Sequence, residues 1–403
     1  MKDPTFDLHD AEGSDIVDVL KKDSIGIVVA VSLSLLILLA TSVALLYLWK
    51  GQDGLIIERP SSALVSWEMD YRNMIGADDN SLSSLDGQGV VLCIVDSGID
   101  LHHPDLRGIE IIGWRDSVNG LEDPYDDEGH GTAMSGIIVA NGGLKGISRG
   151  VDLLVAKAID DEGQGSASTV AESVDWCVQQ GADIISLSLG GGQSFGSGLF
   201  TTDQLEQSVD EALDKGVFVI ASAGNDGEDD DGDVGSPGSV EDVICVGGIT
   251  RTGGIWSGSS EGDNDGRLWP NPILPRNNPD KKPEIVAPGH EVPVLMASGV
   301  GNSEWWGWSS GTSAATAWVS GSLALLLQED PDLQRENSSG RQAIEAVKEA
   351  ISQASQMKEG QDSHDDHYGY GHLRIDLLVS HFDSDEDVNN SSIKPQGFRL
   401  SSQ

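Results

Sequence analysis

The chain has 403 residues, of which 66 are acidic and 24 are basic, so its formal net charge is −42 and its sequence pI is near 4.2. A surface this negative repels phosphate backbones, which argues against nucleic acid as a partner. Apolar residues make up 38% of the chain and form long blocks, which argues against global disorder.

The strong acidity has two interpretations. It is typical of halophile-like surfaces, which carboxylates keep soluble in concentrated salt. It also occurs in acidic proteins with ordinary salt requirements. We favour the halophile-like interpretation, which predicts that the protein loosens at low ionic strength, where repulsion between carboxylates is unscreened.

An uncharged apolar run near the start predicts a membrane anchor. Residues 1–24 form an acidic N-terminal tail, and residues 25–49 read IGIVVAVSLSLLILLATSVALLYLW. At ~1.5 Å per residue this run spans the ~30 Å hydrocarbon core of a bilayer. It is longer than the apolar core of a cleaved signal peptide. Lys21 and Lys22 before the run favour an inside N-terminus, so we expect a single-pass protein whose large domain is extracytoplasmic.

Strand-like and helix-like segments alternate through the rest of the chain. Residues 50–84 are interpreted as a juxtamembrane segment and the start of the next domain, with a short helix near 67–75 and regular structure from Gly89. Continuous apolar runs are typical of parallel strands covered on both faces, and they lie at 90–96, 152–159, 182–189, 217–223 and 243–249. Helix-like stretches lie at 131–140, 167–180, 202–215, 312–328 and 341–355.

This alternation predicts an α/β fold with a doubly wound, mostly parallel sheet and helices on both faces. The domain is expected to span 85–380, preceded by one transmembrane helix. Residues 381–403 are interpreted as a disordered polar tail. Three cysteines cannot form a disulfide framework, so Cys93, Cys177 and Cys245 are expected to be buried thiols that act as small apolar side chains.

Four polar residues follow strands or begin helices, where doubly wound sheets gather their active sites. Asp96 ends the first of these runs, His130 and Ser313 begin helices, and Asn225 comes shortly after the run at 217–223. A serine hydroxyl needs a histidine to accept its proton, and that imidazole needs a carboxylate on its other nitrogen. Asn225 and the backbone N–H of Ser313 are candidate donors to an oxyanion.

The motifs around these residues resemble the subtilisin-like serine protease family. They are VDSGIDLHHPDL (95–106), GHGTAMSGI (129–137), SLSLGG (186–191), ASAGN (221–225), PEIVAPG (283–289), SGTSAAT (310–316) and GYGHLRID (369–376). The resemblance implies that Asp96 orients His130, that His130 is general base and then acid, and that Ser313 is the nucleophile. It also implies that Asn225 stabilises the oxyanion and that the chemistry needs no cofactor.

The same resemblance implies where an extended peptide or protein substrate binds. One wall of the pocket for the residue before the cut is expected at Ser188, Leu189 and Gly190. The other wall is expected at Ala221, Ser222, Ala223 and Gly224, with Gly235 at the floor and Asp226 at the rim. Gly163, Gln164 and Gly165 are expected to pair with the main chain of the substrate.

The sequence also departs from the family pattern. About 35 residues separate the apolar run from the first catalytic motif, which is too short for the usual prodomain. The family often binds structural calcium, and Asp105 stands at a common ligand position, although the loop at 140–146 that would complete the site is short. The acidic loop at 227–235 offers a second place for Ca²⁺.

These features lead to one main function and two alternatives. We expect a membrane-anchored serine endopeptidase that works through an Asp-His-Ser triad and an acyl-enzyme. One alternative is a catalytically silent peptide-binding module with the same fold. The other is a peptide ligase, in which an amine replaces water in resolving the same acyl-enzyme.

Overall fold

The structure is a computed structural model that describes residues 13–50, 59–189, 204–227, 233–262, 276–301, 304–338 and 340–382. The chain divides into two compact units, Met1–Arg59 and Pro60–Gln403, and each is described by itself. The predicted tail at 381–403 lies almost wholly outside the described residues, and a helix at the end of the second unit extends to Phe382.

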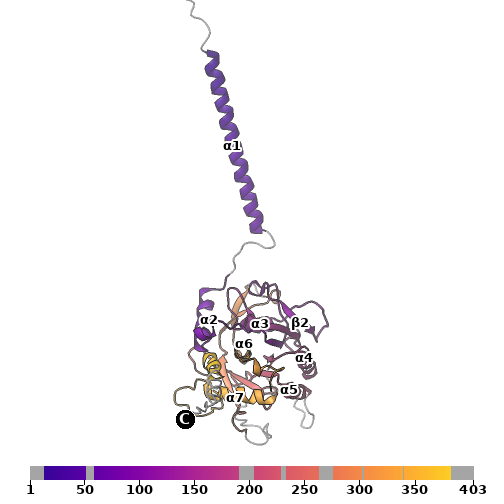
Figure 1. The fold of residues 1–403 in the computed structure, drawn as a ribbon. Helices are drawn as coiled ribbons and strands as arrows, with labels where there is room; N and C mark the ends of the chain where they lie inside the picture. Colours follow the sequence, from indigo (N-terminus) through magenta and orange to yellow (C-terminus); the bar gives the residue numbers. More distant parts are fainter. Residues whose placement is uncertain are drawn as a thin grey trace, which may run out of the picture. The chain divides into compact units, whose positions relative to one another are not determined.

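The first unit contains one long helix, α1 (Gly13–Lys50). Within it, Gly26–Leu46 has a mean hydropathy of 2.6, and its side chains are exposed. Length and composition would allow this segment to cross a membrane. The helix begins at Gly13, so it includes the second half of the predicted acidic tail, residues 1–24 (Figure 1).

The second unit is built on a seven-stranded parallel sheet with the order β2-β3-β1-β4-β5-β6-β7. The predicted doubly wound α/β fold is therefore confirmed. A separate antiparallel pair, β8 and β9, lies outside this sheet. The strands are β1 (Val91–Asp96), β2 (Ile111–Asp116), β3 (Asp152–Lys157), β4 (Ile184–Leu187), β5 (Phe218–Ser222), β6 (Ile244–Ile249), β7 (Ile285–Pro288), β8 (Val292–Leu295) and β9 (Trp306–Ser309).

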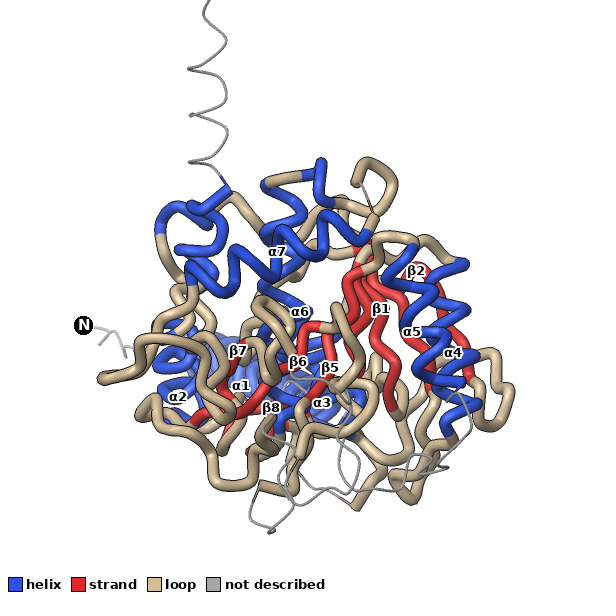
Figure 2. The backbone as a smooth tube through the Cα atoms, turned by 90° about the horizontal axis from the view of Figure 1, so that it is seen from below, coloured by secondary structure: helices blue, strands red, loops and turns tan. Residues whose placement is uncertain are grey.

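Helices cover both faces of the sheet. Figure 2 shows α4 and α5 side by side on one face, while α3 and α6 pack together on the other. The side chains of α6 are buried from Thr312 to Leu327, so this helix forms the centre of its layer. The helices are α2 (Ser62–Met74), α3 (His130–Val139), α4 (Ala167–Gln179), α5 (Gln204–Asp214), α6 (Thr312–Glu329) and α7 (Arg341–Ala354).

Helix α2 agrees with the short helix expected near 67–75 but begins earlier, at Ser62, so regular structure starts before Gly89. Its Tyr71 and the following Ile75 are fully buried in the main apolar core. Its Glu68 accepts a hydrogen bond from the backbone N–H of Lys145 at 2.6 Å, and Arg72 donates to the Lys145 carbonyl at 3.1 Å. Residues 50–84 were expected to hold a juxtamembrane segment and the start of the next domain, and the folded second unit includes them from Pro60 onward.

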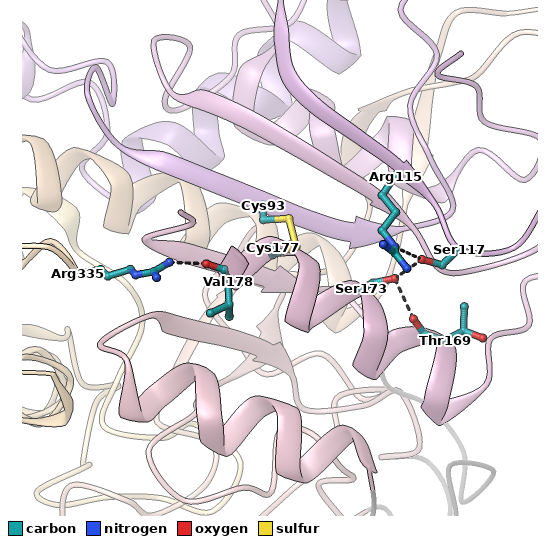
Figure 3. The surroundings of a disulfide bond; sticks show 8 residues. All are labelled: Cys93, Arg115, Ser117, Thr169, Ser173, Cys177, Val178 and Arg335. Carbon is teal, nitrogen blue, oxygen red and sulfur yellow. Dashed lines mark hydrogen bonds between the residues drawn. A yellow bond between two sulfur atoms is a disulfide. The ribbon is translucent and has the colours of Figure 1, made fainter. Parts of the chain in front are cut away.

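The expectation of three free thiols is wrong for two of them. Cys93 in β1 and Cys177 in α4 form a disulfide, and both are fully buried (Figure 3). The side chains of strand residues alternate between the two faces of a sheet, and Cys93 points to the face that α4 covers. Cys245 is a free, buried cysteine. Burial raises the pKa of its thiol to about 12, so it stays protonated.

Candidate active site

The carboxylate of Asp96 and the ring of His130 form a hydrogen-bonded pair at the carboxyl end of β1. His130 Nδ1 lies 2.7 Å from Asp96 Oδ1, which also accepts the backbone N–H of Ser97 at 2.7 Å. Asp96 is fully buried, whereas 33% of the His130 side chain is exposed. A buried carboxylate on Nδ1 leaves Nε2 of the ring to exchange a proton with a reacting group.

Opposing effects set the pKa of His130. Burial of the ring lowers it, while the charge and hydrogen bond of Asp96 raise it, and Glu128 and Asp126 act in the same direction as Asp96. Together they raise the pKa of His130 to about 9. The protonated, imidazolium form of His130 is therefore stabilised. A group that accepts a proton during a reaction benefits from such stabilisation.

A polar network that the sequence analysis missed fixes the start of α3. Asp126 is buried and accepts hydrogen bonds from Gly129 N at 2.7 Å and from Thr132 N at 2.8 Å, so it ties down the first turn of the helix that begins with His130. It also accepts the hydroxyl of Ser97 at 2.9 Å. Asp126 therefore couples the position of α3 to the peptide that follows Asp96.

A buried lysine supports the same peptide. The ammonium group of Lys157 donates to the carbonyls of Ser97 and Ile159 at 2.7 and 2.8 Å and to the carboxylate of Asp127 at 2.6 Å. Its side chain is fully buried, and these three acceptors satisfy its three donors. A lysine at the end of an apolar strand gave no sequence signal for this role.

Ser313 lies in the first turn of α6 and is 7% exposed. Its hydroxyl donates to the backbone carbonyl of Ser188 at 2.9 Å. Ser188 directly follows β4, so this contact places the hydroxyl at the same edge of the sheet as Asp96. The positive end of the α6 dipole also favours negative charge at this position.

Two nitrogen atoms that can donate hydrogen bonds, one from Asn225 and one from Ser313, border the same small space at the start of α6. The side-chain oxygen of Asn225 accepts the backbone N–H of Thr312 at 2.9 Å, so the amide nitrogen of Asn225 is not turned toward that N–H. A Cβ atom placed on Gly311 would lie 3.5 Å from that amide nitrogen and 3.8 Å from the backbone nitrogen of Ser313. Two donors around one small space are the arrangement that stabilises an oxyanion.

The segment expected to pair with a substrate is a turn organised by Asp160. The backbone N–H of Asp160 donates to the carbonyl of Gln164 at 2.9 Å, and Asp160 Oδ1 accepts the N–H of Gln164 at 2.8 Å. Gly163 has a φ of +74°, which favours glycine, and it is exposed. Within the described part of the chain, the carbonyl of Gly163 and the N–H of Gly165 have no hydrogen-bond partner. They are thus available to another main chain.

The expected pocket walls lie at the ends of β4 and β5. Ser188 is buried and Leu189 packs against the core, while Gly190 lies outside the described residues. On the other side, Ala221, Ser222 and Ala223 are buried and lead to Gly224, whose φ is +118°. A Cβ atom on Gly235 would meet nothing within 4 Å, so there is open space beside it.

The surroundings of Asp105 do not fit a calcium ion. Its Oδ1 accepts the backbone N–H of Gly143 at 2.7 Å. Its Oδ2 accepts the N–H of Leu144 at 2.9 Å and the indole N–H of Trp306 at 2.7 Å. Cation sites offer oxygen ligands, whereas here N–H donors face the carboxylate. Across the described residues there is no group of three acidic, histidine or cysteine side chains arranged to hold a metal, and most of the acidic loop at 227–235 lies outside them.

Comparison with known proteins gives a family assignment. The model of the subtilase family matches residues 87–371. The chain is 34% identical over 273 residues to the serine protease AprX of Bacillus subtilis, an alignment that covers 62% of this chain and 59% of AprX. It is 29% identical over 289 residues to the major intracellular serine protease of Bacillus subtilis, covering 69% of this chain and 81% of that protein.

A third relative is subtilisin E of Bacillus subtilis, 30% identical over 250 residues, with coverage of 61% of this chain and 57% of subtilisin E. The chain thus spans about six tenths of the length of some of these relatives. The matched region begins after α1 and α2, so the similarity concerns the part of the second unit that carries Asp96, His130, Asn225 and Ser313.

Proposed function

Because this chain belongs to the subtilase family, we propose that it is a serine endopeptidase in which Asp96, His130 and Ser313 act as the catalytic triad. The observation that carries the proposal is the 2.7 Å contact between His130 Nδ1 and buried Asp96, at the sheet edge where the Ser313 hydroxyl also lies.

In this mechanism the Ser313 hydroxyl leaves the Ser188 carbonyl by rotation about its Cα–Cβ bond and turns to the His130 ring. His130 takes the hydroxyl proton as the oxygen attacks the scissile carbonyl, and Asp96 stabilises the resulting imidazolium. The amide of Asn225 and the backbone N–H of Ser313 stabilise the oxyanion. His130 then protonates the leaving amine, and water resolves the acyl-enzyme by the reverse sequence of proton transfers.

A fluorophosphonate probe tests this function, because it reacts with an activated serine and not with an ordinary one. We expect labelling of the full-length protein that disappears in Ser313→Ala and in His130→Ala. Peptidase activity of the double variant should be little below that of either single variant, since triad residues act as a unit. Failure to label folded protein at any salt concentration would favour the silent peptide-binding module, and ligated products in mass spectrometry would favour the ligase.

We also propose that α1 anchors the enzyme in a membrane, with the second unit outside the cytoplasm. The uncharged segment Gly26–Leu46 and the paired lysines before it support this topology. The disulfide between Cys93 and Cys177 supports the same side, because disulfides persist in oxidising compartments. In intact cells, an external protease should digest the second unit but not a tag placed before residue 13, and the protein should resist extraction by alkaline carbonate.

The strong acidity supports a further part of the proposal, that the enzyme works in a salt-rich medium. With 66 acidic and 24 basic residues, the folded chain is stabilised when ions screen its carboxylates. Calcium is not part of the proposed chemistry, and the donors around Asp105 give it no oxygen site there.

A further inference from the structure

Helix α2 and strand β9 together present large apolar side chains to water. The rings of Trp67 in α2 and Trp308 in β9 pack edge to face, with their centroids 4.7 Å apart. Met69 is 54% exposed and Trp308 is 44% exposed. The guanidinium carbon of Arg251 lies 4.1 Å from the centre of the Trp67 ring. We call this surface, made of Trp67, Met69, Arg251 and Trp308, the α2 face. A contiguous exposed surface of this kind is typical of a contact with a membrane or a partner.

The two tryptophans of the α2 face keep their indole N–H groups for the surroundings. Trp306, in the same strand as Trp308, donates its indole N–H to buried Asp105 at 2.7 Å. Within the described part of the chain, by contrast, the indole N–H groups of Trp67 and Trp308 have no hydrogen-bond partner. An aromatic body with an unused donor suits the boundary between hydrocarbon and water, where tryptophan is enriched in membrane proteins.

The acidic residues of α2 leave little free charge on this surface. The guanidinium group of Arg251 pairs with the carboxylate of Asp70 at 3.0 Å. Glu68 is 7% exposed and accepts the backbone N–H of Lys145, and burial raises its pKa to about 7. In a chain with a net charge of −42, a surface helix whose carboxylates are paired or buried is a place where repulsion from lipid headgroups is weakest.

The length of the connecting chain limits which surfaces of the second unit can meet a bilayer that holds α1. Pro60 begins the second unit ten residues after Lys50, the last residue of α1. Ten residues span at most about 35 Å when fully extended, whereas a folded domain of this size is about 50 Å across. If the side opposite Pro60 lay on the bilayer, Pro60 would be beyond the reach of that chain. Since α2 begins two residues after Pro60, at Ser62, the α2 face is among the surfaces that stay close.

From these observations we propose that the α2 face binds the headgroup layer of the bilayer, with zwitterionic lipids such as phosphatidylcholine as its partner. The inference rests on the proposed membrane anchor. Met69 and the two indole rings lie among the headgroups, and the indole N–H groups donate to the phosphate and ester oxygens of the lipid. Anionic lipids are the poorer partner, because the chain as a whole is strongly negative.

This binding would also place the catalytic serine. Ser313 is five residues beyond Trp308, so their Cα atoms are at most about 18 Å apart. Docking of the α2 face would therefore hold the active site close to the membrane surface, rather than leave it to move over the whole reach of the connecting chain.

A single fluorophore on the full-length protein tests the proposal. The native cysteines do not compete for the label, because Cys93 and Cys177 are bonded to each other and Cys245 is buried. Met69→Cys is labelled with nitrobenzoxadiazole and the protein is placed, one copy per disc, in phosphatidylcholine nanodiscs. The discs are made with ordinary lipid or with lipid brominated in the upper acyl chain, which quenches fluorophores at the interface. We expect a loss of fluorescence in the brominated discs.

Leu121→Cys is the matched control. Leu121 is 53% exposed, nearly as much as Met69, and its carbonyl accepts the indole N–H of Trp114 in β2 at 3.0 Å. Figures 1 and 2 show α2 and β2 on opposite sides of the second unit. The label at 121 should therefore keep its fluorescence in brominated discs. Trp308→Ser, combined with the label at 69, should reduce the quenching while the thermal unfolding temperature stays the same, because the Trp308 side chain is largely exposed.

Three outcomes would overturn the inference. The label at 69 keeps its fluorescence in brominated discs, or the labels at 69 and 121 are quenched equally, or quenching at 69 occurs only in discs with two copies, which would make a second copy of the chain the partner. In each case the protein still enters discs and its Ser313 still reacts with fluorophosphonate, so the proposed anchor and protease function stand. If the chain does not enter discs at all, the anchor fails and the docking fails with it.

Discussion

The side-chain oxygen of Asn225 accepts two groups of Thr312, the backbone N–H at 2.9 Å and the hydroxyl at 3.0 Å. Since N–H and O–H groups donate to the oxygen, the amide nitrogen must face the other way. Thr312 is fully buried, and its hydroxyl also accepts the N–H of Gly224 at 3.2 Å. The start of α6 therefore sets the direction in which Asn225 offers its donor.

Removing that donor should lower turnover strongly. Asn225→Ala is expected to lose about 10²–10³ in kcat with little change in KM, a magnitude measured on subtilisin itself. Thr312→Val keeps the backbone N–H that holds Asn225 and should lose much less. Steady-state kinetics on both variants checks the order, and equal losses would show that the hydroxyl, not the backbone, directs the amide.

Gly311 allows a test that separates catalysis from folding. Its φ of 169° is ordinary extended backbone, so Gly311→Ala should fold with unchanged stability. The added methyl group would lie 3.5 Å from the amide nitrogen of Asn225 and 3.8 Å from the nitrogen of Ser313. We expect it to occupy part of the oxyanion space and lower kcat while the thermal unfolding temperature stays the same. A fall in both quantities would contradict this interpretation of the space.

The raised pKa of His130 predicts an alkaline enzyme. Only the neutral ring can accept the Ser313 proton, and a pKa of about 9 leaves most molecules protonated at pH 7. kcat/KM should therefore increase about tenfold per pH unit below that value and level off above it. In Asp96→Asn the midpoint should move to lower pH while kcat falls by about 10⁴. A profile already flat at pH 7 in the wild type would exclude this assignment.

The raised pKa of His130 also affects the stability of the folded protein, and this effect weakens with rising pH whereas activity increases. Because the folded-state pKa of His130 lies above its ordinary value of 6.5, protonation stabilises the folded protein. This contribution is complete below pH 6.5 and is lost as the pH rises through about 9. The enzyme should thus gain activity over the pH range in which it loses this part of its stability.

The disulfide predicts a stability that depends on the redox state of the chain. Cys93 and Cys177 are 84 residues apart, and closing a loop of that size contributes up to about 4–5 kcal/mol in the chain-entropy model. Wild-type protein refolded with a reductant should have a lower urea midpoint than oxidised protein. The Cys93→Ala/Cys177→Ala variant should not respond to reductant, whereas Cys245→Ala should respond as wild type does. Identical wild-type midpoints in both states would argue that the bond is absent.

The acidic surface predicts a salt requirement. Raising the potassium chloride concentration should increase the thermal unfolding temperature, because screening relieves repulsion among the carboxylates that give the chain a net charge of −42. Sucrose at equal osmolality is the control, since it leaves charges unscreened. If the thermal unfolding temperature does not change with salt, the result would support the alternative of an acidic protein with ordinary salt requirements.

The sequence predicted the central strands and the main helices within one or two residues. Strands covered on both faces form uninterrupted apolar runs, and five such runs coincide with β1, β3, β4, β5 and β6. The edge strand β2 was not predicted, because its residues are half-exposed and include Arg115 and Asp116, so they form no continuous apolar run. The strand β7 and the ribbon of β8 and β9 have only four residues each, too few for a clear pattern.

What the sequence could not predict depends on contacts between distant segments. The bond between Cys93 and Cys177 requires the register of β1 against α4, which no local pattern encodes. No sequence pattern indicates the roles of Lys157 and Asp126. In the folded chain Lys157 donates to the Ser97 carbonyl, and Asp126 accepts the Ser97 hydroxyl. The position of Glu128 beside Gly163 likewise follows only from the meeting of two loops.

The compact second unit begins at Pro60, whose ring contacts Gly143, while α1 ends at Lys50. A single hydrolytic cut within 51–58 would consequently separate α1 from the second unit and leave the hydrogen bonds of α2, α3 and α6 in place. If α1 is the membrane anchor that we propose, such a cut would turn a tethered enzyme into a diffusible one, with its catalytic groups unaltered.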